Sequence, residues 1–145
     1  MSSKVNLFNF QLSPNFNFAE FVVSSEFQDV ADKIQPTPKQ INSIYLLANF
    51  ALQPLREMFG QVIITSGLRS PELNMLVGGV DTSQHLAGEA ADFSVSSADL
   101  SIVHDFILHD LSWKGQVRYY RQKGFIHIGM PNYYIPGTQT IVLEG

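Results

Sequence analysis

The longest hydrophobic pattern in the chain lies between Pro38 and Met58 and has the spacing of a helix. Its apolar positions recur every three or four residues, as expected for one buried helix face: Ile41, Ile44, Tyr45, Ala48, Ala51, Leu52, Leu55 and Met58. Thr37 supplies a hydroxyl cap before Pro38, and Gly60 marks the end of the pattern. Because Pro54 lacks a backbone N–H, we expect this core helix to kink there.

Runs of β-branched and aromatic residues predict strands. Two of these runs cover residues 62–65 and 90–95, and three more follow at residues 116–121, 125–130 and 139–143. The last three come after all the helical patterns. Helices that come first and strands that pair late indicate an α+β domain, with helices packed on a mostly antiparallel sheet.

Cap and turn residues define the other elements. A short helix is predicted from the Asn17 and Glu20 capping box to Val23, followed by a loop with one helical turn over residues 24–37. Two further helices are predicted, one from Ser70-Pro71 to Gly78-Gly79 and one over about residues 98–110 capped by Ser97. Residues 1–16 are rich in Asn, Ser and Phe and are predicted to form an irregular N-terminal arm. We expect residues 1–145 to form a single domain.

Composition excludes several classes of function. The chain has no cysteine, so disulfides, cysteine zinc sites and thiol nucleophiles are excluded. A net charge of -4 argues against a nucleic-acid partner, and no stretch is long and apolar enough for membrane insertion. The first residues lack the apolar run of a secretory signal, so we expect synthesis in the cytoplasm. We also expect a monomer.

The basic residues are scattered apart from one loose group near the predicted strand 116–121. This group consists of Lys114, Arg118, Arg121 and Lys123. A solvated strand edge is the favoured interpretation of the group, and an anion-binding site is the alternative.

Three residues have the chemistry of one metal site. His85 precedes Asp92 by seven residues, and His127 lies in a later apolar strand. Two imidazoles and one carboxylate, with a fourth position left to water, are a common protein contribution to a catalytic zinc ion. Asp92 itself stands in an apolar strand, where a buried carboxylate needs a compensating charge. The alternatives are an Asp92 paired with Arg69 or with backbone amides, and a His127 that is a satisfied core histidine.

Other polar residues have weaker claims to a function. Arg69 follows a strand and a glycine turn, where it can hold a substrate carboxylate or a developing oxyanion; a surface position is the alternative. Ser83 and Gln84 can bind a peptide or orient a ligand, although loops often carry such residues without that role. His104 and His109 are five residues apart on a predicted helix, which is poor ligand spacing. We expect both to be on the surface or partly packed.

The same residues carry a resemblance to a known family. The segment Ser83-x-His85-x-x-Gly88-x-Ala90-x-Asp92 resembles the Ser-x-His-x-x-Gly-x-Ala-x-Asp motif of the zinc D-Ala-D-Ala carboxypeptidase-like peptidases, the M15 family. Residues 125–128 resemble the late aromatic-x-His strand of that family. Four segments resemble the small, often phage-encoded branch of the family: residues 17–21, 54–56, 66–74 and 77–79. The resemblance covers about residues 16–130.

The resemblance implies a fold, a cofactor and an activity. The fold would be the α+β fold shared with hedgehog signalling domains, and Zn²⁺ would be held by His85, Asp92 and His127. Arg69 would lie in the substrate cleft and Ser83 near the substrate. The partner would be the peptide part of bacterial peptidoglycan, cleaved by a carboxypeptidase or an L-Ala–D-Glu-type endopeptidase. Such an enzyme would reach the cell wall after release from the cell, as a phage endolysin does, or as part of a virion.

The chain departs from the family pattern at the general base, the carboxylate that takes a proton from water and passes it to the leaving amine. Many members have an acid three residues before the last histidine, where this chain has Gly124. The phage-like branch often has an acid a few residues after a glutamine. In this chain the glutamine is Gln116, and the corresponding later position is Tyr120.

Other groups can replace the missing base. The candidates are Glu89, the more distant Asp81 and Glu144, and the hydroxyl of Tyr120 or Tyr119. We expect an active peptidase whose catalytic residues beside the metal are Arg69, Tyr120 and Glu89. The alternative is a zinc-binding relative that binds cell-wall peptide, or serves in a virion, with little or no cleavage.

Overall fold

The computed structural model describes residues 9–131, and their main sheet has four strands. In spatial order these are β3 (Val62–Ser66), β4 (Ala90–Val95), β6 (Phe125–Gly129) and β5 (Val117–Tyr120). Each neighbouring pair is antiparallel. The α+β class and the antiparallel sheet are therefore confirmed. The predicted strand 139–143 lies outside the described residues.

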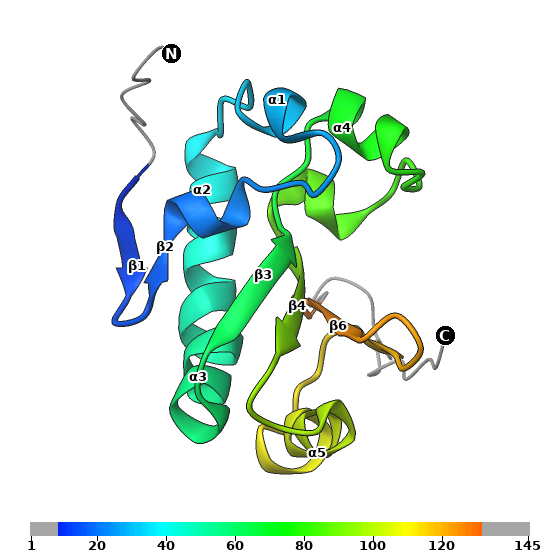
Figure 1. Ribbon diagram of the computed structural model, residues 1–145. Helices are drawn as coiled ribbons and strands as arrows, with labels where there is room; N and C mark the ends of the chain where they lie inside the picture. Colours follow the sequence, from blue (N-terminus) through cyan, green and yellow to red (C-terminus); the bar gives the residue numbers. More distant parts are fainter. Residues whose placement is uncertain (1–8, 132–145) are drawn as a thin grey trace.

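The predicted core helix is one long rod in Figure 1, made of α2 (Pro38–Leu47), a π-helical segment η2 (Ala48–Leu52) and α3 (Gln53–Phe59). Its N-terminus has the full capping box, with the Thr37 hydroxyl accepting from the Gln40 N–H. Instead of a simple kink, the helix responds to Pro54 with a wider turn just before it. The Gln53 N–H bonds to the Ala48 carbonyl, five residues back.

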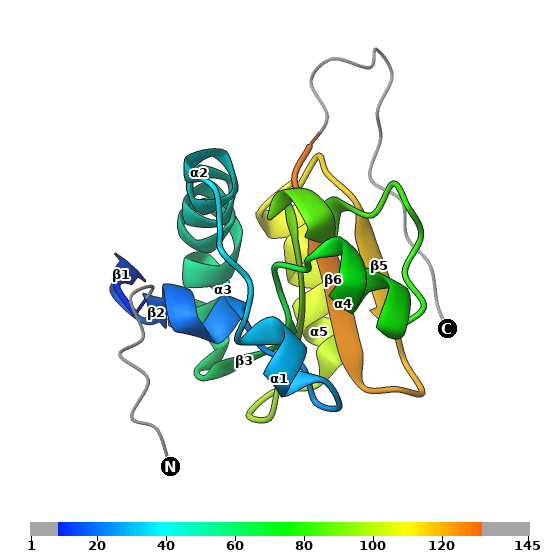
Figure 2. The same cartoon turned by 90° about the horizontal axis from the view of Figure 1, so that it is seen from above.

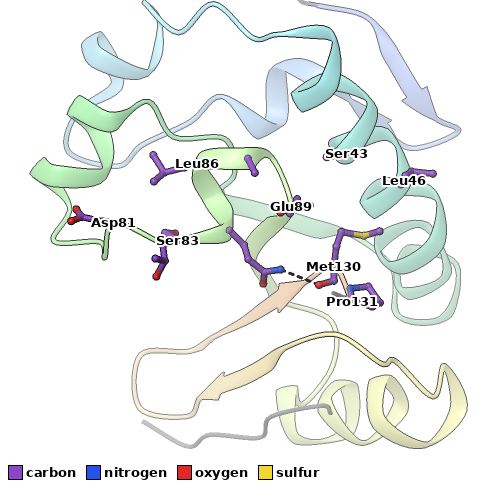
Figure 3. A pocket seen from close by; sticks show the side chains of 11 residues that line it. Ser43, Leu46, Asp81, Ser83, Leu86, Glu89, Met130 and Pro131 are labelled. Atoms are coloured by element: carbon purple, nitrogen blue, oxygen red, sulfur yellow. Dashed lines mark hydrogen bonds between the residues drawn. The ribbon is translucent and has the colours of Figure 1, made fainter. Parts of the chain in front are cut away.

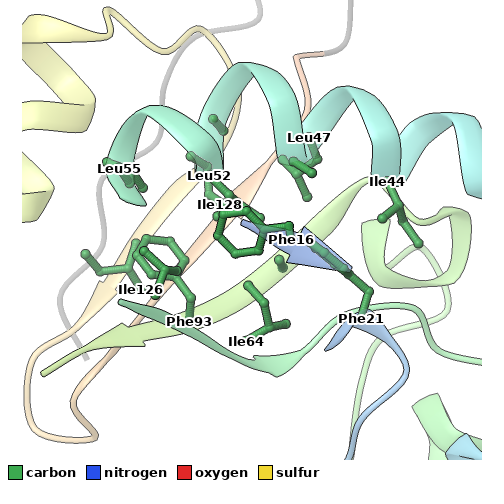
Figure 4. Close-up of a cluster of buried hydrophobic side chains, with 14 of the residues drawn as sticks. Phe16, Phe21, Ile44, Leu47, Leu52, Leu55, Ile64, Phe93, Ile126 and Ile128 are labelled. Carbon is green, nitrogen blue, oxygen red and sulfur yellow. The ribbon is translucent and has the colours of Figure 1, made fainter. Parts of the chain in front are cut away.

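The core lies between this long helix and one face of the sheet. Leu47, Leu52 and Leu55 point from the helix toward Phe93 and Ile126 on the strands (Figure 4). The strand residues on this face are cross-strand partners: Ile64 pairs with Phe93, which pairs with Ile126, which pairs with Tyr119. Burial of one such side chain stabilises the fold by about 1.5–3 kcal/mol. Since side chains alternate along a strand, the intervening residues face the other way.

The other helices cover both faces of the sheet. Helix α5 (Leu100–Asp105) continues as a π-helical segment, η4 (Phe106–Asp110), and packs on the core side, where Phe106 meets Phe59 edge to face at 5.3 Å. Helix α4 (Pro71–Leu76) lies on the opposite side of β6 from α5 in both views (Figures 1 and 2). A 3₁₀ turn, η3 (Gln84–Ala87), contacts both α4 and β4.

Two local predictions need correction. Within the predicted irregular arm, β1 (Gln11–Ser13) and β2 (Phe16–Asn17) form a two-stranded antiparallel hairpin, because the buried Phe16 anchors it in the core. The cap of α5 is Asp99 rather than Ser97, since the Asp99 carboxylate accepts from the Ser101 N–H at 2.9 Å. The Ser101 hydroxyl donates to the same Asp99 oxygen at 2.8 Å, and the helix therefore begins two residues later than predicted.

The segment between the hairpin and the long helix matches its sequence pattern. The Asn17 and Glu20 capping box starts a 3₁₀ helix, η1 (Phe18–Phe21), whose two phenylalanines are fully buried. One helical turn, α1 (Gln28–Ala31), follows in the expected loop. In the part of the chain that the structure describes, no helix is long and apolar enough to cross a membrane.

Candidate metal centre and substrate cleft

A row of polar side chains crosses the sheet on the face opposite the core. Ser66 on β3 is the register partner of Asp92 on β4, Asp92 that of His127 on β6, and His127 that of Arg118 on β5. Cross-strand partners present their side chains on the same face, so these four residues lie side by side. Antiparallel pairing thus joins residues that are up to 61 positions apart in the chain.

His85 reaches this row from the 3₁₀ turn η3. The turn is capped by Ser83, whose hydroxyl accepts from the His85 N–H, and it ends at Gly88 in the left-handed conformation (φ 71°). The His85 Nε2 atom lies 3.3 Å from Asp92 Oδ1, and the ring centroids of His85 and His127 are 5.1 Å apart. The three sequence-predicted metal ligands are therefore together.

Gly67, in the turn before Arg69, positions the His85 imidazole. Its carbonyl accepts from Nδ1 of His85 at 2.7 Å, and a Cβ at Gly67 would overlap the backbone of Phe21. The Arg69 N–H in turn bonds to the His85 carbonyl at 3.0 Å. Only a glycine allows the turn to approach η1 this closely. The approach places the Gly67 carbonyl within hydrogen-bond distance of the His85 imidazole.

The donor set fits one divalent metal ion. One ligand atom each from His85, Asp92 and His127 lies within 4.8 Å of the others, and all three residues are buried, at 3%, 9% and 9% exposure. Nδ1 of His85 donates to Gly67, which leaves Nε2 as the ligand atom. Nδ1 of His127 lies 2.8 Å from Asp92 Oδ1, while its Nε2 lies 3.0 Å from the Gln116 side-chain oxygen. Each imidazole thus has an outer partner of the kind that orients metal ligands.

The protonation states also suit metal binding. Burial acts to raise the pKa of Asp92, but hydrogen bonds from His127 and His85 outweigh it and hold that pKa well below its usual range. Burial lowers the pKa of His127, against the opposing effect of Asp92. The site therefore offers an ionised carboxylate and an imidazole that favours its neutral form near pH 7, as a metal requires.

Arg69 is held by its neighbours. Its Nε lies 3.2 Å from the Ser66 hydroxyl, Nη1 lies 3.2 Å from the Asn74 side-chain oxygen, and Nη2 lies 3.8 Å from Asp92 Oδ2. Burial lowers the pKa of Arg69, and the charge of Asp92 opposes this. The pairing of Asp92 with Arg69, which the sequence offered as an alternative to metal binding, thus coexists with the histidine contacts.

A cleft of about 340 Å³ opens over the three ligands. Arg69, Ser83 and Tyr120, which were expected near the substrate, all line it. The Tyr120 ring stacks on Phe125 with the centroids 4.5 Å apart. Among the described residues, Asp92 is the one carboxylate in the cleft lining.

Glu89 and Gln84 line a second pocket instead, of about 580 Å³ (Figure 3). Ser83 borders both pockets, and Asp81 also lies in the second one. The Gln84 amide is used in packing, because Nε2 donates to the Met130 carbonyl at 2.9 Å. The structure thus does not bring Glu89, Asp81 or Gln84 into the cleft above the metal ligands.

Tyr119 and His104 also lie away from the cleft. Tyr119 is buried on the core face of the sheet, with its ring centroid 5.3 Å from that of His104. His104 is itself buried, so the expectation of a surface or partly packed position was wrong for it, whereas His109 is exposed. The burial of His104 follows from its place beside Val103 on the inner side of α5. Glu144 lies outside the described residues.

The sequence did not single out Asn74 and Gln116 as site residues, and for Arg118 and Lys123 it favoured a solvated strand edge over an anion-binding site. Asn74 is buried and holds Arg69, Gln116 holds His127, and both cations line the cleft. Alternation along β5 was the available signal, since Arg118 and Tyr120 share a face while Val117 and Tyr119 are buried.

Comparisons with known proteins agree with this site. A search of curated proteins found no matching relative. The family model described as peptidase M15 matches residues 14–129, which covers every strand and helix of the site and most of the chain. M15 peptidases are zinc-dependent, and the His–Asp–His group can bind such an ion. With the ligand geometry and the family match in agreement, this chain belongs to the peptidase M15 family.

Proposed function

We propose that this protein is a zinc-dependent peptidase that hydrolyses peptide bonds in the stem peptides of bacterial peptidoglycan. The observation that carries the proposal is the meeting of His85, Asp92 and His127 at the floor of a cleft, with ligand atoms within 4.8 Å of one another. Membership of the M15 family supports peptide hydrolysis as the reaction. Carboxypeptidase and endopeptidase action both remain within the proposal, as does a role in phage lysis.

The three ligands would hold the ion through Nε2 of His85, Nδ1 of His127 and the Asp92 carboxylate. When bound, zinc supplies a Lewis acid and lowers the pKa of water at its open position. With the ion bound, the Gly67 carbonyl and the Gln116 side-chain oxygen would accept from the other ring nitrogens and so fix the two imidazoles in the tautomers that ligation requires. Burial of the ligands excludes bulk water from beneath the reacting bond.

Tyr120 and Arg69 are the catalytic residues that the cleft favours. The Tyr120 hydroxyl can donate a proton to the leaving amine or a hydrogen bond to the developing oxyanion. Arg69 holds Asp92 and keeps part of its five-donor fork for substrate. Ser83 borders the cleft and can bind the peptide. Glu89 faces the neighbouring pocket, so a part for it in proton transfer would require movement of its loop.

A second candidate function has one observation in its favour. Among the described residues, Asp92 is the one carboxylate lining the cleft, and the family's acid position is Gly124. Loss of a general base costs about 10²–10⁴ in rate. The alternative is therefore a zinc-binding module that holds cell-wall peptide, free or in a virion, with little turnover.

Digestion of purified peptidoglycan separates the two candidates. Zinc-loaded protein is incubated with walls of several peptide types, and newly released amino groups and fragments are identified by mass spectrometry. We expect the wild type to release fragments and a chelator to abolish this release. Asp92→Asn should also abolish it while its circular dichroism stays unchanged, whereas the exposed-site control His109→Ala should keep it. Stoichiometric zinc with no release from any wall would overturn the peptidase proposal in favour of the binding module.

A further inference from the structure

We propose that Arg118 and Lys123 form a carboxylate-binding subsite beside the metal ligands, which recognises a free carboxylate on the residue next to the scissile bond. The inference rests on the proposed peptidase function and deepens it by naming a feature of the substrate. The sequence favoured a solvated strand edge for these two cations. Their placement in the structure separates them from Lys114 and Arg121, which do not line the cleft.

Arg118 is built into the site by the sheet. It is the register partner of His127, so its side chain lies on the same face as both His127 and Asp92, and it lines the cleft. Burial is the main cause of the lowered pKa of His127, and the charges of His85 and, to a smaller extent, Arg118 lower it further. This effect of Arg118 is expected for a guanidinium near the imidazole.

The Arg118 Nε atom is buried and has no hydrogen-bond partner among residues 9–131. A buried N–H without an acceptor is rare in folded proteins, because it has lost its hydrogen bonds to water without gaining others. An acceptor supplied by the substrate would make up for this loss. A carboxylate is the acceptor that a guanidinium binds best, because two parallel hydrogen bonds can form.

Lys123 places a second positive charge at the same cleft. It lies in the turn between β5 and β6, and its ammonium is 5.7 Å from the centroid of the Tyr120 ring. No carboxylate of the described residues lies within ion-pair distance of Lys123 or Arg118. Neither charge is compensated within the described protein, although the chain as a whole has a net charge of -4.

Arg69 differs from these two cations, because its charge already faces a carboxylate of the protein, that of Asp92. All three of its nitrogens have partners in Ser66, Asn74 and Asp92. The charge of Asp92 is thus balanced inside the site, and the excess positive charge comes from Arg118 and Lys123. An anionic group of the substrate is the complement that this excess favours.

Two kinds of peptide carry a carboxylate in the required place. In a carboxypeptidase substrate it is the free C-terminus of the leaving residue. In an endopeptidase substrate it is the α-carboxylate of a glutamate that is linked through its side chain. The subsite recognises the shared group, and matched peptides distinguish the sources.

The test is peptide binding to the metal-free protein, which reads the subsite without hydrolysis. Two peptide pairs are titrated and followed by NMR: N-acetyl-Lys-D-Ala-D-Ala and its C-terminal amide, and Ala-γ-D-Glu-Lys with the glutamate α-carboxyl free or amidated. We expect the carboxylate form of at least one pair to bind at least about tenfold more tightly than its amide. The pair that shows the preference identifies the source.

Variants assign the preference to the two residues. Arg118→Gln should bring the two forms close to equal affinity, and Lys123→Gln, in an exposed turn outside the sheet, should reduce the preference with the fold intact. The exposed control Lys39→Gln on α2 should keep it. Equal affinities for both pairs in the wild type, including no binding, would overturn the subsite, as would a preference that survives both substitutions.

Failure of the subsite differs from failure of the proposed function. Zinc-dependent hydrolysis with no carboxylate preference contradicts the subsite alone. A carboxylate preference that depends on Arg118, in a protein that releases nothing from any wall, contradicts the peptidase function and leaves the subsite in place.

Discussion

Asp92 and His127 face each other across adjacent antiparallel strands, with Asp92 Oδ1 and His127 Nδ1 2.8 Å apart. The same carboxylate oxygen lies 3.3 Å from Nε2 of His85. Asp92 is thus the residue at which two distant segments of the chain meet. In the metal-free protein its carboxylate contacts both histidines and Arg69, and with metal bound it would be the anionic ligand.

Removal of a ligand should remove the metal. We expect Asp92→Asn and His127→Ala to lose stoichiometric zinc, because two remaining ligands bind zinc far more weakly than three. Plasma mass spectrometry of protein purified without chelator measures the zinc content, and circular dichroism checks the fold. The exposed His109→Ala is the control and should keep its zinc. Full zinc content in Asp92→Asn would contradict the assignment.

Gln116 should tune zinc affinity without contacting the ion. Its side-chain oxygen lies 3.0 Å from Nε2 of His127, where it can hold the ring in the tautomer that leaves Nδ1 free. We expect Gln116→Leu to weaken zinc binding about 10–100-fold, measured by competition with a chromogenic chelator. Gln61→Leu, at an exposed position before β3, is the matched control. Equal affinities of the two variants would mean that Gln116 has no part in orienting His127.

Gly67 should couple the fold to the metal site. A Cβ there overlaps the Phe21 backbone, so we expect Gly67→Ala to destabilise the protein by about 1–3 kcal/mol in urea unfolding and to lower zinc affinity through His85. Gly78→Ala is the control: its φ is 77° but its Cβ meets open space. That variant should lose about 1–2 kcal/mol and keep its zinc affinity. Normal zinc affinity in Gly67→Ala would show that the position of this turn does not affect metal binding.

The stability of the metal-free protein should fall as the pH falls. Burial lowers the folded-state pKa of His127 below its unfolded value of about 6.5, so below that pH the unfolded state binds more protons. The stability associated with neutral His127 is therefore complete above about pH 6.5 and is lost as the pH drops through the folded-state pKa. Asp92 adds a second loss below about pH 3.9, because its folded-state pKa is also lowered.

Urea unfolding between pH 7.5 and 5 measures the His127 component. We expect His127→Gln to show a flatter dependence than the wild type over this range, while the exposed control His109→Gln keeps the wild-type slope. Identical slopes for wild type and His127→Gln would show that this imidazole does not titrate differently in the two states.

Tyr120 should affect turnover and leave metal binding unchanged. Its ring lines the cleft, but it is not a ligand. We expect Tyr120→Phe to lower kcat by about a hundredfold with little change in KM, as for loss of a proton donor, and to keep full zinc content. Tyr45→Phe, exposed on α2, is the control. An unchanged kcat in Tyr120→Phe would place the proton transfer on another group.

Local signals were sufficient for most of the fold. Thr37-Pro38 and Ser70-Pro71 begin helices as predicted, and the β-branched run near Ile64 forms a strand, because caps and side-chain stiffness act within a few residues. The hairpin at residues 11–17 was missed, because it depends on the burial of Phe16 in a core formed by distant segments. No neighbour in the sequence reports such burial.

The sequence by itself determined the chemistry: which residue types can ligate a metal, which family motif they form, and where the usual acid is replaced by Gly124 and Tyr120. The tertiary structure decided which groups share the cleft. Strand register places Arg118 beside His127, and the path of the loop after η3 sends Glu89 to another pocket. The physical reason is that a shift of one residue in register turns a side chain to the opposite face, and the register depends on how the strands pair and on the turns between them rather than on the residue types alone.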